Sequence, residues 1–292
     1  GCFAKILKKE DHAKDWETGG YSLNSDIVSS GLDADKLDYL RRDSYHIGAA
    51  YGQFDLERII LTLKKTPTKN RICIDQKGKD AIENYRLGRY LMHAQVYEHH
   101  ARISADQMFL KALKFAVEDN VIDKKSLKAS ANSSNKKFLD YYLKLDDRGI
   151  YQIILNKKNS RSAKILDAIN CRKLLKRACE YELVPMEDYE VNSKILKLDP
   201  EKLTDELASQ TKINHADIIV KVSKITIKLY DKGDILVLHK GIPVDFNDLS
   251  PISSENSITK LLVFGPRDND KREKLTKAIA NYLKIPAKEI RV

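Results

Sequence analysis

The segment that decides the fold is SSGLDADKLDYLRRDSYHIGAAYGQFDLERII, residues 29–60. Its part from Asp33 to Gly48 opens with acidic residues, which stabilise the first turn of a helix. Leu37 and Leu40 then fall on one side of that helix. The segment therefore predicts a helix with one apolar face and one polar face.

The flanking sequence extends this helical pattern. A second helix is predicted over residues 54–65, and a short strand over 71–75. The stretch 77–119 has no proline and only two glycines, so it predicts two or more long helices. A polar stretch at 124–137 predicts an exposed connection, followed by further helices within 138–173.

The last third of the chain has a different pattern. β-branched runs predict strands of one small sheet, at residues 217–222, 225–229, 235–238 and 260–264. Turn signals at 231–233 and 240–241 separate them, and a helix is predicted over 270–283. We therefore expect a helical domain over residues 1–165 and an α/β domain over residues 166–292.

Composition limits the class of protein. Of 292 residues, 42% are hydrophobic and 32% are charged, which predicts a folded chain rather than a disordered one. The 52 basic and 42 acidic residues give a net charge of +10, which favours either polyanionic partners or solubility alone. No apolar stretch approaches the roughly 20 residues of a membrane span, so we expect a cytoplasmic protein without membrane contact. The four cysteines form no Cys-x-x-Cys pair and are expected to be reduced and mostly buried.

One face of the first predicted helix carries polar side chains at steps of four, four and three residues: Asp35, Tyr39, Asp43 and His46. Lys36 and Arg42 stand beside this face. Carboxylates bind metals, and cations and hydroxyls bind phosphate oxygens, so the face is a candidate site. The alternative is a solvated polar face with ordinary surface ion pairs.

A second stripe with the same spacing lies further along the chain: Arg89, His93, Tyr97 and His100. A guanidinium binds phosphate, and a tyrosine stacks on a sugar or base while donating a hydrogen bond. The alternative is a set of structural or surface side chains. The sequence has no Gly-rich Lys-Ser/Thr loop, Gly-x-Gly-x-x-Gly, Gly-x-Ser-x-Gly or His-Glu-x-x-His motif.

Residues 29–60 closely resemble the HD-domain phosphohydrolases of the deoxynucleoside triphosphate triphosphohydrolase type. The segment is similar to the last part of their His…His-Asp…Asp metal-binding signature, and Asp35 matches the final aspartate in an Asp-x-Asp-Lys-x-Asp-Tyr helix. The stretch 245–253 resembles part of the C-terminal appendage of that family more weakly. The resemblance implies a mainly α-helical HD-type domain, incomplete at its N-terminal side, with a C-terminal α/β appendage.

The resemblance also implies a reaction and roles for five substrate-binding residues. Lys36 and Arg89 would hold the triphosphate, and Tyr39 would touch the phosphates near the scissile bond. Asp43 would accept a hydrogen bond from the sugar 3′-hydroxyl, and Tyr97 would pack on the deoxyribose. The products would be a deoxynucleoside and tripolyphosphate.

Asp35 would be a ligand of a divalent metal, and Mg, Mn, Fe, Zn and Ni are not distinguished. His46 and His93 are further candidate pocket residues. The chain departs from the family pattern because only His12 precedes Asp35 and no His-Asp pair occurs. Asp11-His12 has the reverse order. The rest of the metal site is then removed, supplied by another polypeptide, or lost.

We therefore expect a metal-dependent enzyme that hydrolyses deoxynucleoside triphosphates. The alternative is a non-catalytic nucleotide-binding, single-stranded nucleic-acid-binding or regulatory protein with a degenerate HD site. The resemblance implies a homo-oligomer, either a dimer or a tetramer, and nucleic acid is a further candidate partner.

Overall fold

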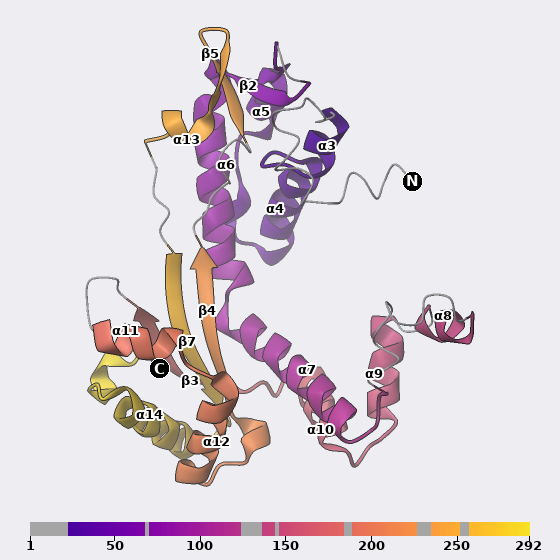
Figure 1. Cartoon of the computed structure of the whole chain (residues 1–292), viewed down its shortest axis with the longest axis vertical. Helices are drawn as coiled ribbons and strands as arrows, with labels where there is room; N and C mark the ends of the chain where they lie inside the picture. The colour runs from indigo at the N-terminus through magenta and orange to yellow at the C-terminus, as the bar shows by residue number, and fades with distance from the viewer. Residues whose placement is uncertain are drawn as a thin grey trace. The chain divides into compact units, whose positions relative to one another are not determined.

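The computed structural model in Figure 1 describes residues 23–67, 70–123, 136–143, 146–183, 189–226, 235–251 and 257–292. The chain divides into two compact units. The first unit contains Gly1–Glu98 and Ile225–Ser257, and the second contains His99–Lys224 and Ile258–Val292. This division differs from the expected one at residue 165, because a late hairpin returns to pair with a strand of the first unit.

The helices of the first unit are α3 (Leu23–Val28), α4 (Ala34–Ile47), α5 (Leu56–Thr62), α6 (Lys79–Met92) and α13 (Phe246–Leu249). Short helical turns are η1 (Ala50–Gly52), η2 (Gln76–Gly78) and the π-helix η3 (His93–Tyr97). The predicted first helix is confirmed as α4. Asp33 caps its start by accepting a hydrogen bond from the Lys36 amide at 2.8 Å, and Gly48 ends it with a left-handed φ of 75°.

The sheet of the first unit has the order β1-β2-β5-β6. Its strands are β1 (Leu63–Lys65), β2 (Ile72–Asp75), β5 (Leu236–His239) and β6 (Ile242–Asp245). β2 and β5 are parallel, whereas β1–β2 and β5–β6 are antiparallel. The β5–β6 turn is at Lys240 and Gly241, both with positive φ, as a tight hairpin requires. The predicted helix over 54–65 is wrong for its last three residues, because these pair with β2 as β1.

A buried ion pair joins α3 to β2 in the first unit. The side chains of Asp26 and Arg71 are only 3% and 7% exposed. The guanidinium donates to both carboxylate oxygens at 3.0–3.1 Å, and the Ile72 amide donates to the same carboxylate at 2.8 Å. The cation is thus neutralised by a fully hydrogen-bonded carboxylate.

The helices of the second unit are α7 (His100–Glu118), α8 (Lys136–Tyr142), α9 (Asp147–Leu155), α10 (Arg161–Asn170), α11 (Tyr189–Leu196), α12 (Pro200–Thr211) and α14 (Asn269–Leu283). Two short turns are η6 (His215–Asp217) and η7 (Ala287–Glu289). α7 packs on α10 around an apolar cluster that includes Ala112, Ala116 and Leu166. The helices predicted within 77–119, 138–173 and 270–283 are confirmed.

The second sheet has the order β3-β7-β4, with β3 (Lys176–Leu183), β7 (Ser257–Gly265) and β4 (Ile219–Thr226). α14 packs against β3, and its Leu275 and Ile279 are fully buried in the same cluster as Val263. The expectation of one small sheet is therefore wrong, because the predicted strands divide between two sheets. The predicted turn at 231–233 and most of the polar connection at 124–137 lie outside the described residues.

The three cysteines in the described ranges are free thiols, as expected. Cys73 and Cys179 are buried and Cys171 is exposed. Burial raises the pKa of Cys179 to about 12, so this thiol is not a nucleophile at neutral pH. Within the same ranges, no helix has both the length and the apolar character that crossing a bilayer requires.

Candidate functional site

The candidate site lies between α4 and the end of α6, which η3 directly continues. Helices α4 and α6 lie side by side in the first unit (Figure 1). The Tyr97 hydroxyl donates a 2.8 Å hydrogen bond to Asp43 Oδ2. The Tyr97 ring also meets Tyr39 edge-on at 6.1 Å and His93 at 5.0 Å between ring centroids. Four of the residues selected from sequence are therefore brought together from two separate stripes.

The Tyr97–Asp43 contact fixes the chemistry of both groups. Burial, and next the hydrogen bond to Asp43, raise the pKa of Tyr97 above its ordinary value of 10.0. Tyr97 therefore stays protonated at neutral pH and acts as the donor. A carboxylate has about four acceptor positions, so Asp43 retains capacity for a hydroxyl donor from a ligand.

Two glycines allow the supporting turn η1 to approach the helices closely. A Cβ on Gly52 would lie 2.2 Å from the Leu40 carbonyl oxygen of α4. A Cβ on Gly88 of α6 would lie 2.9 Å from the Tyr51 carbonyl oxygen of η1. Only glycine permits both approaches, and these contacts set the spacing between α4 and α6.

Tyr85 provides a further anchor beneath the site. Its fully buried side chain donates a 3.0 Å hydrogen bond to the Gly31 carbonyl, just before α4. Its ring also meets Phe54 edge-on at 5.0 Å. The core of the first unit thereby holds α6 against the start of α4.

The second polar stripe is shorter than the sequence predicts. The π-helix η3 ends at Tyr97, and the Glu98 amide donates to the His93 carbonyl at 2.9 Å. His99 then caps α7, with Nδ1 accepting from the Ala101 amide at 3.3 Å. The inclusion of His100 in the stripe is therefore wrong, because the helix breaks and His100 begins α7 in the second unit. π-helical turns are frequent at functional sites.

The other predicted residues have different environments. Asp35 is exposed in the first turn of α4. Lys36 is half-buried, and its ammonium pairs with Asp33 and donates to the Ser30 carbonyl at 3.0 Å. The structure thus orients Lys36 toward the start of its own helix.

Arg89 is half-buried on α6, one helical turn before His93. His46 is exposed near the end of α4, edge-on to the Tyr45 ring at 5.3 Å. The roles of these residues in binding substrate stay predictions.

The described residues do not form a metal site. No group of three or more His, Cys, Asp and Glu side chains gathers within them. Asp35 is therefore a single carboxylate, and one carboxylate does not fix a divalent metal.

Sequence reasoning missed Arg86, which is 4% exposed on α6. Its guanidinium donates to Asn247 Oδ1 at 3.0 Å and lies 4.8 Å from the centre of the Phe246 ring. These contacts join α6 to α13, within the stretch 245–251. The weak resemblance of that stretch to the family's appendage was the available signal.

A model of the family described as "HD associated region" matches residues 54–292. The chain belongs to the HD-associated region family. Some relatives of this HD-associated region chain are named as deoxynucleoside triphosphate triphosphohydrolases. One is SAMHD1 of Danio rerio, 26% identical over 264 residues, which are 83% of this chain and 41% of the relative. HD phosphohydrolases generally use divalent metals.

Other relatives of this HD-associated region chain are more similar but shorter in overlap. An uncharacterized protein of Bacillus subtilis, YwfO, is 34% identical over 155 residues, which are 52% of this chain and 35% of the relative. The matched region is thus about a third of the full length of that relative.

Solved structures share the fold. A phosphohydrolase of Bacteroides thetaiotaomicron has a TM-score of 0.62 at 20% identity, over 91% of this chain and 71% of that one. A hypothetical protein of Aquifex aeolicus has a TM-score of 0.60 at 24% identity, over 87% of this chain and 60% of that one. This HD-associated region chain therefore shares its fold with both of these proteins.

Proposed function

We propose that this chain acts in the metal-dependent hydrolysis of deoxynucleoside triphosphates to deoxynucleosides and tripolyphosphate. The observation that carries the proposal is the hydrogen bond between Tyr97 and Asp43. It joins an aromatic ring to a carboxylate, and a deoxyribose presents complementary apolar and hydroxyl groups to that combination. The name of SAMHD1 supports the choice of substrate.

Asp43 and Tyr97 recognise the sugar in this proposal. Asp43, held by Tyr97, accepts the 3′-hydroxyl proton in a hydrogen bond. The Tyr97 ring packs against the 2′-carbon, where a ribose hydroxyl would meet it. A ring at this place disfavours ribonucleotides by sterics.

The phosphates need cations and hydroxyl donors around them. Arg89 of α6 supplies a permanent charge, and Tyr39 of α4 supplies a hydroxyl at the face shared with Tyr97. Lys36 reaches the phosphates by leaving Asp33, a carboxylate one helical turn away. Asp35 supplies one metal ligand.

The test is product analysis with each deoxynucleoside triphosphate and Mn²⁺ or Mg²⁺, with tripolyphosphate separated by ion exchange. We expect tripolyphosphate from the wild type and a loss of at least about tenfold in Asp43→Asn, because hydrogen bonds to charged groups contribute about 1.5–3 kcal/mol. Asp38→Asn is the matched control, since Asp38 is an exposed carboxylate of the same helix paired with Arg42. Equal turnover of Asp43→Asn and wild type would contradict the assignment.

A second candidate function is nucleotide binding without hydrolysis. It is favoured by the lack of a three-ligand metal cluster within the described ranges. Saturable binding of a deoxynucleoside triphosphate without any release of tripolyphosphate would favour this candidate. Assembly into a dimer or tetramer stays a prediction of the resemblance, and sedimentation of the purified chain would test it.

A further inference from the structure

A pocket of about 260 Å³ lies wholly within the second unit, apart from the candidate site of the first. α7 forms one wall, the first turns of α12 form another, and η6 with the start of β4 forms the base. Its apolar lining includes Leu110, Phe115, Ile218, Ile219 and Val220. An apolar body therefore fits the interior.

Donor side chains follow one wall of the pocket. Gln107, Lys111 and Lys114 recur at helical spacing along α7, and all three line the cavity. They offer one amide and two ammonium groups. The pocket thus combines an apolar interior with cationic donors from a single helix.

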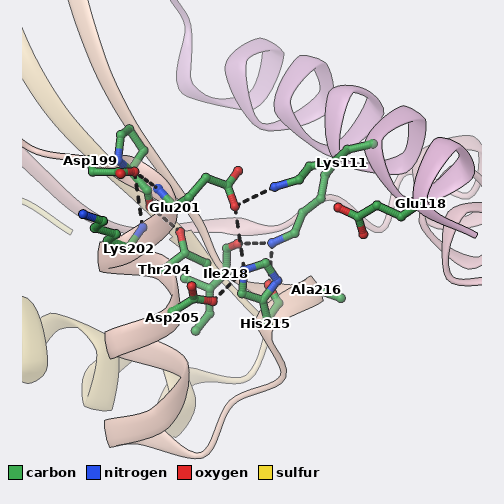
Figure 2. Close-up of polar contacts among 12 residues, drawn as sticks. Lys111, Glu118, Asp199, Glu201, Lys202, Thr204, Asp205, His215, Ala216 and Ile218 are labelled. Atoms are coloured by element: carbon green, nitrogen blue, oxygen red, sulfur yellow. Dashed lines mark hydrogen bonds and ion pairs between the residues drawn. The ribbon is translucent and has the colours of Figure 1, made fainter. Parts of the chain in front are cut away.

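Lys111 is the central cation, and its ammonium binds only carbonyls. It donates to the His215 carbonyl and, at 2.6 Å, to the Ile218 carbonyl, as Figure 2 shows. Among the described residues, no carboxylate lies within ion-pair distance of it. An ammonium has three donors, so one remains after the two carbonyl bonds.

Burial weakens the charged form of Lys111, although the side chain remains mainly a cation at pH 7. Burial lowers the pKa of Lys111 to about 8, although the carboxylates of Glu201, Asp205 and Asp217 oppose this shift. The cation is therefore poorly compensated within the protein. An anion beside it would restore the missing counter-charge.

His215 does not compete for an anion as a cation. Burial, and next the charge of Lys111, lower its pKa below the ordinary 6.5. Its Nε2 lies 3.3 Å from Asp205 Oδ1 and 4.0 Å from Glu201 Oε2. At neutral pH the imidazole is thus uncharged, and it lines the pocket as a polar group.

Lys114, the second lysine of the pocket, already has a carboxylate partner in Glu201. The Glu201 carboxylate pairs with Lys114 at 2.9 Å, and both side chains are well exposed, at 61% and 47%. Exposed pairs of this kind contribute about 0–1 kcal/mol, so a ligand anion displaces Glu201 at small cost.

From this geometry we propose that the pocket binds a small organic anion, with its carboxylate or phosphate oxygens on Lys111 and Lys114 and its hydrocarbon part against Phe115 and Ile218. The volume limits the ligand. Sites for drug-sized molecules commonly enclose about 300–1,000 Å³, so this one takes a single ring or a short chain. The lining residues of this pocket all belong to the second unit, whereas the site proposed for hydrolysis belongs to the first.

The experiment is calorimetric titration of the whole chain at pH 7 with phenyl phosphate, benzoate and phenol, which share one ring. We expect saturable binding of at least one of the two anions with a Kd of about 1 mM or below, and much weaker binding of phenol. The two anions distinguish phosphate from carboxylate recognition. Lys111→Met and Lys114→Met should each weaken binding at least about tenfold, and Glu201→Gln should strengthen it.

Two controls locate the site. Lys202→Met removes an exposed cation of α12 that does not line the pocket, and Asp38→Asn alters an exposed carboxylate of the first unit. Both should bind as wild type does. Lys114 is exposed, so its substitution tests the proposal even if Lys111→Met fails to fold. No saturable heat from either anion, equal binding of phenol, or undiminished binding by Lys114→Met would overturn the proposal, whatever the outcome for hydrolysis.

Discussion

Arg71 in the first unit is buried and Lys111 in the second is half-buried, and their charges are compensated differently. Arg71 binds a buried carboxylate, Asp26, through hydrogen bonds of 3.0–3.1 Å. Lys111 binds two backbone carbonyls and has no carboxylate partner among the described residues. A carbonyl dipole satisfies a donor but cancels no charge.

This difference separates structure from recognition. The Asp26–Arg71 pair is complete, so it has nothing left to offer a ligand and serves to fix α3 on β2. Lys111 still attracts an anion and borders a cavity that admits one. Of these two cations, only the one that lacks a counter-charge is therefore suited to bind a ligand.

The largest effect on the unfolding free energy is expected from breaking the Asp26–Arg71 ion pair. Arg71→Met leaves the Asp26 carboxylate buried and uncompensated, and such losses cost about 3–5 kcal/mol. Urea denaturation monitored by circular dichroism would measure the fall in unfolding free energy. A fall below about 1 kcal/mol would show that the pair is not the anchor described here.

Because Lys111 has no carboxylate partner among the described residues, its titration should make the unfolding free energy depend on pH. The folded pKa of Lys111 is about 8, below its ordinary 10.5, so between these pH values the unfolded chain binds more protons. The unfolding free energy of wild type relative to Lys111→Met should therefore rise from pH 8 to pH 10.5. We expect a rise of about 1–3 kcal/mol in urea denaturation series on both proteins. A constant difference over this range would mean that Lys111 carries an ordinary surface charge.

A smaller effect is expected at the candidate site. Tyr97→Phe removes the donor to Asp43 and keeps the ring, and one such hydrogen bond contributes about 1 kcal/mol to the unfolding free energy. Thermal unfolding of both proteins would measure it. An unchanged midpoint would indicate that water replaces the Tyr97 hydroxyl without loss.

The smallest effect belongs to an exposed pair on α4. Arg42 and Asp38 lie 2.9 Å apart with side chains 57% and 61% exposed, so Arg42→Met should cost less than about 1 kcal/mol. The same urea denaturation gives the contrast with Arg71→Met. Similar losses in the two variants would remove the distinction between buried and exposed pairs.

Local signals allowed much of the fold to be predicted from sequence. The carboxylate of Asp33 and the left-handed Gly48 define α4 through contacts within a few residues. The two sheets could not be separated in this way. Pairing of Ile74 with Val237 depends on residues far apart in the chain, and the pairing of β1 with β2 overrides a helical pattern at Leu63.

The contacts of the candidate site likewise could not be predicted from local sequence signals. Helical spacing selected Asp43 and Tyr97 separately, but their contact depends on the packing of α4 against α6. Lys111 has no distinguishing sequence feature, because Lys114 shows the same spacing on the same helix. Lys111 is distinguished only by its hydrogen bonds to the carbonyls of His215 and Ile218, which form when the chain folds.

The most direct test of the proposed function is the discrimination between deoxyribose and ribose. Equilibrium binding of each deoxynucleoside triphosphate and its ribonucleotide counterpart would be measured for wild type, Tyr97→Phe and Tyr97→Ala. We expect wild type and Tyr97→Phe to prefer the deoxynucleotide, because both retain the ring, and Tyr97→Ala to bind the two sugars equally. Equal binding of both sugars by the wild type, or an undiminished preference in Tyr97→Ala, would contradict the assignment of this site.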